Sequence, residues 1–249
     1  MPQHHLFITG TSRSGTTTIA NFLRNDQAIV MGRERFAWRL AKTGDFDPSL
    51  FEKHRFCIDY QADDSHHAVH QAYYGQAAEY FEQAQWVGDK LPSLFNHYNK
   101  LISNFPDCQV IYMMRNPYEV ADSYQKRAEK TQQQVAQGQS AERLWPVERN
   151  WRVAIDEWNE SIAKTLEAMK KLRIFVIKYE DLYRDTVVLK SLYQSLQLPL
   201  PPTQLELWQQ NADKRKEIEA KRALGLDEYQ RSVIAATINS DNYAQLLSQ

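Results

Sequence analysis

The most informative stretch of the sequence is Leu6-Phe7-Ile8-Thr9-Gly10-Thr11-Ser12-Arg13-Ser14-Gly15-Thr16-Thr17. Four strand-prone residues lead into a turn of Gly, Ser and Thr, and a helical pattern follows at once over residues 18–23. A phosphate-binding loop requires this order of strand, small-residue loop and helix, because the N–H groups at a helix N-terminus attract anions. The sequence therefore predicts an anion-binding loop at the end of the first strand.

This loop differs from the Walker A pattern G-x-x-x-x-G-K-[ST] at one position. Gly10 and Gly15 have the required spacing and Thr17 supplies the hydroxyl, but Thr16 stands where the lysine should be. The cation has moved back to Arg13. We expect the loop to hold an anionic group with backbone N–H groups and one side-chain cation, in a way that differs from an ordinary ATPase.

Short apolar runs and the segments between them indicate the fold class. The runs that have the character of buried parallel strands are residues 6–9, 28–31, 86–88, 109–114 and 173–178. The intervening segments are long enough for crossover helices, which is the pattern of a sheet covered on both faces. The sequence thus predicts an α/β fold with a P-loop-type parallel five-stranded sheet flanked by helices.

Helical composition or periodicity marks the remaining segments. Helices are expected over residues 68–85, 93–104 with Ser93 as N-cap, 146–171, 187–196, 203–222 and 227–247. In the long helix over 146–171, the spacing places Trp151 and Trp158 in the core. The polar, aperiodic stretch Gln132 to Gln139 is expected to be a loose connection or a mobile lid. We expect one domain over residues 1–249, with a core over 6–200 and a helical C-terminal extension over 203–249.

Composition excludes several classes of function. With 249 residues, 43% of them hydrophobic, and a net charge of -1, the chain can bury a sizeable core but lacks the basic surface of a general nucleic-acid binder. Cys57 and Cys108 form no C-x-x-C pair, so a reduced compartment is the simpler interpretation. The anion loop starts close to Met1 and no apolar run approaches about 18 residues, so no membrane span and a cytoplasmic location are expected.

A second anion signature follows the fourth expected strand. Arg115 ends that strand, Pro117 lies in the first turn of a new helix, and Ser123 and Arg127 share one face of it. Arginine with a hydroxyl is a common phosphate site. Since both signatures lie at carboxyl ends of parallel strands, they should meet at one edge of the sheet. Two separate phosphate sites imply a ligand with two phosphate groups in different places.

These motifs resemble the sulfotransferase family, which uses 3′-phosphoadenosine 5′-phosphosulfate (PAPS). The family's 5′-phosphosulfate loop, R/K-S-G-T-T, is similar to residues 13–17, and its motif R-[ND]-P-x-[DE]-x-x-x-S is similar to residues 115–123. Its Y-E-D-L segment after the last core strand matches residues 179–182. The resemblance covers roughly residues 6–200 and implies a PAPS-dependent transfer to an acceptor hydroxyl or amine, without a required metal.

The resemblance also implies the residues that bind the donor. The 5′-phosphosulfate site would comprise Ser12, Arg13, Ser14, Gly15, Thr16 and Thr17, and the 3′-phosphate site would comprise Arg115, Ser123 and Arg127. Tyr179 resembles the family position near the adenine, although a tyrosine at a strand end is often only core packing. The acceptor could be a small molecule, a sugar or a peptide, and the sequence indicates neither its identity nor the oligomeric state.

Two further residues are candidates for the chemistry of transfer. Glu34 follows the second expected strand at the distance where the tyrosylprotein and glycan sulfotransferases have their base, although the family's G-E-E-T-R reads Gly32-Arg33-Glu34-Arg35-Phe36 here. The alternative is that Glu34 is a salt-bridged residue at a helix start. Lys90, in Asp89-Lys90-Leu91-Pro92, resembles the family lysine that stabilises the transferred group, together with Arg13. The alternative for Lys90 is a solvated strand-end lysine.

Other charged or ligating residues have more ordinary interpretations. His66, His67 and His70 lack further ligands for a metal site and are expected on a helix surface, and His54 is an alternative base that lies far from any motif. The basic runs 214–216 and 221–222 could contact the 3′-phosphate but are more typical of a solvated helix face. Two rival functions remain: an ATP-dependent small-molecule kinase of the P-loop class, and a catalytically inactive nucleotide-binding protein.

Overall fold

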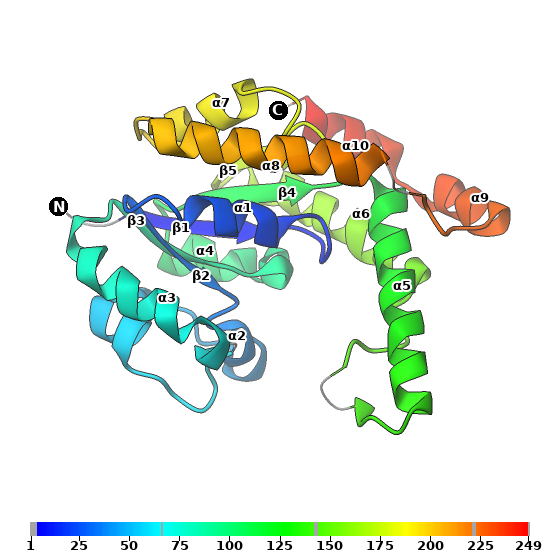
Figure 1. Cartoon of the computed structure of the whole chain (residues 1–249), viewed down its shortest axis with the longest axis horizontal. Helices are drawn as coiled ribbons and strands as arrows, with labels where there is room; N and C mark the ends of the chain where they lie inside the picture. Colours follow the sequence, from blue (N-terminus) through cyan, green and yellow to red (C-terminus); the bar gives the residue numbers. More distant parts are fainter. Residues whose placement is uncertain (1–3, 66, 142–143, 221–222, 249) are drawn as a thin grey trace.

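The computed structural model describes residues 4–65, 67–141, 144–220 and 223–248 and is built around one sheet. Five strands lie parallel in the order β2-β3-β1-β4-β5 (Figure 1). They are β1 (His4–Thr9), β2 (Ile29–Arg33), β3 (Trp86–Lys90), β4 (Gln109–Met114) and β5 (Arg173–Lys178). Each overlaps a run that the sequence predicts, so the α/β fold with a P-loop-type parallel sheet is confirmed.

Alternation along β1 sends side chains to two separate cores. Leu6 and Ile8 pack with three helices on one face, α1 (Thr16–Leu23), α7 (Val187–Ser195) and α8 (Pro202–Ala220). Phe7 points to the other face and contacts a cluster of aromatic rings, Phe46, Phe51 and Phe105, with centroids 5.0–5.4 Å away. Because β1 is central and covered on both faces, the loop that follows it has a rigid base.

The second face is covered by helices of very different lengths. On the face toward which Phe7 points lie α2 (Ala37–Thr43), α3 (His67–Tyr80) and α4 (Tyr98–Asn104). The same face carries three 3₁₀ turns (Pro48–Phe51, Phe81–Gln83, Pro92–His97) and a π-helical turn (His54–Ile58). Beneath β4 lie α5 (Pro117–Ala136), α6 (Trp151–Ala168), α9 (Glu228–Thr237) and α10 (Ser240–Leu247). The helical C-terminal extension therefore divides between the two faces of the sheet.

One predicted loop is a helix. Helix α5 continues to Ala136, so most of the stretch from Gln132 to Gln139 is helical, and the prediction of a loose connection or lid there was wrong. Glutamine and alanine are good helix formers, and an exposed helix needs no apolar period. The helix ends only before Gly138, whose φ of 87° lies in the left-handed region typical of a helix end. In Figure 1 the C-terminal half of α5 extends away from the sheet.

Several predicted helix boundaries also differ. The helix expected from residue 146 begins at Trp151, because the side chain of Asn150 accepts a hydrogen bond from the N–H of Arg152 and caps it. Trp151 and Trp158 are buried, as the spacing predicts. The segment 227–247 forms two helices because Asn239 caps the second. Residues 93–97 form a 3₁₀ turn, so Ser93 is not an α-helix N-cap. Residues 221–222 lie outside the described residues.

The edge strand β2 is partly covered by α3. The hydroxyl of Tyr73 accepts a hydrogen bond of 2.9 Å from the backbone N–H of Met31. This contact satisfies a donor that an open sheet edge would expose. Among the described residues, no helix is both long and apolar enough to cross a membrane.

Candidate active site

All five strands end at the same edge of the sheet, and the predicted site residues lie there. The anion loop follows β1, Glu34 follows β2, Lys90 ends β3, Arg115 follows β4 and Tyr179 follows β5. The register pairs Arg33 with Lys90 on neighbouring strands. The carboxyl ends of strands in an open α/β sheet are where ligands bind, so the topology brings the separate motifs to one place.

The backbone of the anion loop is shaped for close approach. Gly10, Arg13 and Gly15 have positive φ values of 145°, 70° and 98°. Gly15 is the N-cap of α1 and provides no side-chain cap, so the first N–H groups of the helix remain for a ligand. Among the described residues only Arg13, Glu34 and Gln197 have positive φ without being glycine. Backbone strain of this kind concentrates at functional sites, and two of the three residues were candidates from the sequence.

Hydrogen bonds to distant residues fix the loop, and the sequence did not indicate them. The hydroxyl of Thr11 lies 2.8 Å from that of Ser161 on α6, which in turn lies 2.7 Å from the hydroxyl of Tyr112. On the other side, the backbone N–H of Phe95 donates to the Thr9 hydroxyl, which itself donates to the carbonyl of Pro92. Contacts with residues so far away along the chain leave no local signal.

A second fixation point is Arg149, in the segment before α6. Its guanidinium donates to Glu157 at 2.7 and 3.0 Å, to the Tyr124 hydroxyl at 3.1 Å and to the Ser12 hydroxyl at 3.3 Å. It also stacks over the ring of Trp145 at 4.5 Å. Hydrogen bonds and charge from Glu157 raise the pKa of Arg149 against the opposing effect of burial, which is the largest single influence. Arg149 therefore stays positively charged, and its hydrogen bond fixes the hydroxyl of Ser12.

Arg13 lies close to two other arginines, Arg115 and Arg127. The Nε of Arg13 donates to the Ser123 hydroxyl at 2.9 Å. Burial and then the nearby charges of Arg127 and Arg115 lower the pKa of Arg13. A cavity of about 440 Å³ lies beside Arg13, lined by Arg13, Asp122, Ser123, Lys126, Arg127 and Lys130. An anion would relieve the mutual repulsion of these arginines.

Arg115 connects the two predicted anion sites. Its Nη1 donates to the carbonyl of Arg13 at 3.0 Å, and its Nε and Nη2 lie 2.7 and 2.6 Å from one carboxylate oxygen of Glu119. The indole N–H of Trp158 donates to the carbonyl of Arg115 and fixes its backbone. Arg115 also lies 4.5 Å from the ring centroid of Tyr179.

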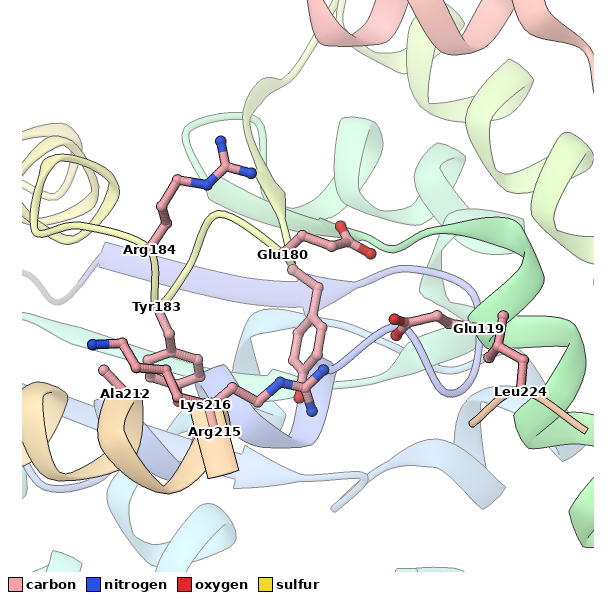
Figure 2. A pocket seen from close by; sticks show the side chains of 9 residues that line it. Glu119, Glu180, Tyr183, Arg184, Ala212, Arg215, Lys216 and Leu224 are labelled. Atoms are coloured by element: carbon pink, nitrogen blue, oxygen red, sulfur yellow. The ribbon is translucent and has the colours of Figure 1, made fainter. Parts of the chain in front are cut away.

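A cavity of about 480 Å³ opens beside Tyr179 and is the one shown in Figure 2. It is lined by Glu119, Tyr179, Glu180, Tyr183, Arg184, Ala212, Arg215, Lys216 and Leu224. In Figure 2 the guanidinium of Arg215 extends from α8 toward the middle of this cavity. It lies 4.6 Å from the Tyr179 ring centroid, so the basic run 214–216 contributes Arg215 and Lys216 to the lining of this cavity instead of forming only a solvated face.

Glu34 and Lys90 form an ion pair between Oε1 and Nζ at the ends of β2 and β3. The Lys90 side chain is only 1% exposed, whereas that of Glu34 is 32% exposed. The backbone N–H of Glu34 donates to the carbonyl of Lys90 at 2.9 Å, which fixes the turn after β2 against β3. Lys90 is therefore not a solvated strand-end lysine. A half-open carboxylate beside a buried ammonium is a suitable arrangement for proton transfer next to developing negative charge.

Comparison with known proteins shows the family to which the chain belongs. The model of a sulfotransferase family matches residues 5–202. The chain belongs to the sulfotransferase family. No curated protein sequence matches this sulfotransferase. A solved sulfotransferase domain from the curacin biosynthetic pathway is 21% identical over 82% of this chain and 77% of its own, with a TM-score of 0.54, and has the same fold.

Two further solved sulfotransferases superpose less closely. The enzyme STF9 from Mycobacterium avium is 15% identical, with 95% of this chain and 76% of that one covered and a TM-score of 0.47. A sulfotransferase from Alicyclobacillus acidocaldarius is 16% identical, with 90% of this chain and 98% of that one covered and a TM-score of 0.47.

The two arginines that flank Glu34 in this sulfotransferase have different environments. Arg35 is fully buried, forms an ion pair of 2.6 Å with Asp64, and donates to the carbonyl of Asp59 at 3.0 Å. Asp64 is also bonded to Arg55 at 2.6 and 2.9 Å. Arg35 therefore anchors the turn after β2 to the π-helical segment. Arg33 remains partly exposed, and burial followed by the charge of Arg24 lowers its pKa.

The alternative base and the histidines expected on a helix surface lie on segments between β2 and β3. His54 is exposed on the π-helical turn, and His70 lies on α3. His66 is outside the described residues. In the described part of the chain, no group of three or more His, Cys, Asp or Glu side chains is placed to hold a metal ion.

Proposed function

We propose that this sulfotransferase moves the sulfuryl group of PAPS to an acceptor hydroxyl or amine by in-line transfer, with Glu34 as the base. The observation that supports it best is the ion pair of Glu34 with buried Lys90 at the same sheet edge as the anion loop. A carboxylate that can accept a proton and an ammonium that can stabilise charge are the two groups that such a transfer requires.

The donor side of the site fits a bisphosphorylated anion. The hydroxyl of Ser14 is buried and has no hydrogen-bond partner among the described residues. Gly15 leaves the N-terminus of α1 without a side-chain cap, and Arg13 has Arg115 and Arg127 as neighbours. An orphaned buried donor next to crowded cations favours an anionic ligand. We assign the 5′-phosphosulfate to Ser12, Arg13, Ser14, Gly15, Thr16 and Thr17.

The 3′-phosphate and the adenine would occupy the neighbouring cavities. We assign the 3′-phosphate to Arg115, Ser123 and Arg127. Tyr179 and Arg215 both line the cavity that Figure 2 shows, and we propose that the adenine binds there. Glu119 bonds to Arg115 in this structure, so donor binding would require Arg115 to exchange a carboxylate for a phosphate.

In the proposed step the acceptor oxygen or nitrogen forms a bond to sulfur while the bond from sulfur to the 5′-phosphate oxygen breaks. PAPS supplies the activated sulfuryl group. Glu34 takes the acceptor proton, and Arg13 and Lys90 stabilise the charge on the transferred group and on the leaving adenosine 3′,5′-bisphosphate. No metal is required, because side-chain cations take its place. We further propose that residues 1–249 act as one cytoplasmic domain on a small-molecule, sugar or peptide acceptor.

Labelled PAPS offered with phenols, sugars and tyrosyl peptides tests the activity and identifies the acceptor class. Calorimetry separates the rival functions: this sulfotransferase should bind adenosine 3′,5′-bisphosphate without metal more tightly than ATP with Mg²⁺. The opposite order would indicate a kinase, and binding without transfer to any acceptor would indicate an inactive nucleotide-binding protein.

Two variants test the assigned residues. Glu34→Gln should retain bisphosphate affinity and lose turnover, whereas full turnover would leave Glu34 only as the counterion of Lys90.

Arg115→Ala should weaken binding of adenosine 3′,5′-bisphosphate with little change for adenosine 5′-phosphate. Arg173→Ala is the matched control, because Arg173 lies at the opposite end of the neighbouring strand β5. Equal loss for both nucleotides would remove Arg115 from the 3′-phosphate site.

A further inference from the structure

The carboxyl group of Asp89 is completely buried directly beside the proposed catalytic pair. Asp89 precedes Lys90 on β3 and pairs in register with Gly32 on β2. Its Oδ2 accepts a hydrogen bond of 3.0 Å from the backbone N–H of Phe36, two residues beyond Glu34. The side chain thus reaches from β3 to the far end of the turn that carries Glu34.

Gly32 makes this reach possible. A Cβ at residue 32 would lie 2.5 Å from Oδ1 of Asp89, a distance too short for real atoms. The carboxylate therefore passes over the bare Cα of Gly32 to meet the N–H of Phe36. Glycine is needed here for close approach, because any side chain at residue 32 would occupy the place of the carboxylate.

The turn between these contacts is strained. Glu34 has a φ of 59°, a left-handed conformation that a glutamate rarely adopts. The backbone N–H of Glu34 donates to the carbonyl of Lys90, and the backbone N–H of Phe36 donates to the carboxylate of Asp89. A strained conformation persists only where its surroundings hold it, and here two of the holding contacts come from the last two residues of β3.

We propose that Asp89 is a positioning residue that fixes the turn of Gly32 to Phe36 and so presents the Glu34 carboxylate to Lys90 and to the acceptor. Asp89 touches no reacting atom. Its effect on transfer passes through Glu34, so the inference rests on the proposed function.

The energetic cost of Asp89 supports a role beyond packing. Burial raises the pKa of the Asp89 carboxyl to about 7, although the N–H groups of Phe36 and Arg35 and the charge of Lys90 oppose the shift. An apolar residue would fill the same space without that cost. Carboxyls with strongly shifted pKa values are concentrated at functional sites.

A double-mutant cycle tests the inference with labelled PAPS and the best acceptor of the screen. Asp89→Ala removes the acceptor of the Phe36 N–H and should lower kcat about 10- to 100-fold, because a displacement of a base by about 1 Å has effects of that size. The dissociation constant of adenosine 3′,5′-bisphosphate should stay unchanged. In the Glu34→Gln background, Asp89→Ala should cause no further loss of kcat. Asp107→Ala, on the opposite edge of the sheet, is the control.

Hydrogen exchange gives a readout that needs no acceptor. Replacement by alanine removes the acceptor of the Phe36 N–H, so in Asp89→Ala the peptide over residues 33–38 should exchange faster while the peptide over β1 is unchanged.

Three results would each overturn the role of Asp89. They are unchanged exchange at residues 33–38, unchanged kcat, and a loss of kcat that multiplies with the loss caused by Glu34→Gln. The proposed function fails differently, by full turnover of Glu34→Gln or by absence of transfer in the wild-type protein, and the exchange result can be read in either case.

Discussion

Gly15 should tolerate no side chain, because the ring of Tyr179 lies against its Cα. A Cβ at residue 15 would lie 2.3 Å from Cδ2 and 2.5 Å from Cε2 of Tyr179. The ring cannot move away easily. Arg115 and Arg215 lie 4.5 and 4.6 Å from its centroid, and the backbone N–H of Tyr179 donates to the carbonyl of Met114 at 2.7 Å.

The free energy of unfolding lost in Gly15→Ala has two parts. Holding alanine at a φ of 98° costs about 1–2 kcal/mol. The overlap with the Tyr179 ring adds about 1–3 kcal/mol, the usual effect of overpacking. Gly138→Ala is the matched control, because Gly138 has a φ of 87° but nothing within 4 Å of its Cβ position, so it should lose only the first part.

Urea unfolding measures the difference in free energy of unfolding between Gly15→Ala and Gly138→Ala, which should be about 1–3 kcal/mol. Each kcal/mol should lower Tm by about 2–4 °C. Tyr179→Ala should remove the overlap, so Gly15→Ala made in that background should cost no more than Gly138→Ala. Equal destabilisation of Gly15→Ala and Gly138→Ala in the wild-type background would refute the packing of Tyr179 on the anion loop.

Other perturbations have equally direct readouts. Arg149→Ala should destabilise the protein by about 1.5–3 kcal/mol in urea unfolding, because it leaves the partly buried carboxylate of Glu157 without its charged hydrogen bonds, whereas the exposed Arg152→Ala should cost less. Burial lowers the pKa of His5 to about 4, so protonation favours the unfolded chain, and stability should fall by up to about 3 kcal/mol as the pH drops from about 6.5 to 4. His5→Phe should abolish that part of the pH dependence while keeping the ring packing, and a wild-type slope in this variant would contradict the assignment. Burial raises the pKa of both Cys57 and Cys108 to about 12, so a thiol reagent should react at pH 8 only after unfolding, and fast labelling of the native protein would contradict their burial.

The strands and the loops that follow them could be predicted because their signals are local. Apolar runs of four to six residues, each followed by Gly, Ser, Arg or Pro, mark the ends of β1 and β4 in the printed sequence. The same signals placed Glu34 and Lys90 at strand ends, and the structure brings the two side chains into contact. Their catalytic roles remain predictions.

The contacts that fix the loop could not be predicted, because their partners are far apart in sequence. Ser12 and Arg149 are separated by 137 residues, and Thr11 and Ser161 by 150. Arg215 belongs to a run of charges that is typical of a solvated face, and only the packing of α8 against α1 brings it to Tyr179. The helical end of α5 was missed for a different reason: polar helix formers on an exposed helix have neither a hydrophobic period nor a turn signal.

The residues that we assign to proton transfer and those that we assign to donor binding follow different strands of this sheet, and the first group follows the paired strands β2 and β3. Glu34 and Lys90 end these two strands, whereas the residues that we assign to the donor follow β1, β4 and β5. The segment from α2 to β3, residues 37–85, can thus vary and adapt the protein to a new acceptor while the strands that we assign to the donor keep their sequence. Grafting residues 37–85 from a related enzyme, with the turn that carries Glu34 retained, should therefore transfer its acceptor preference and leave the donor affinity unchanged.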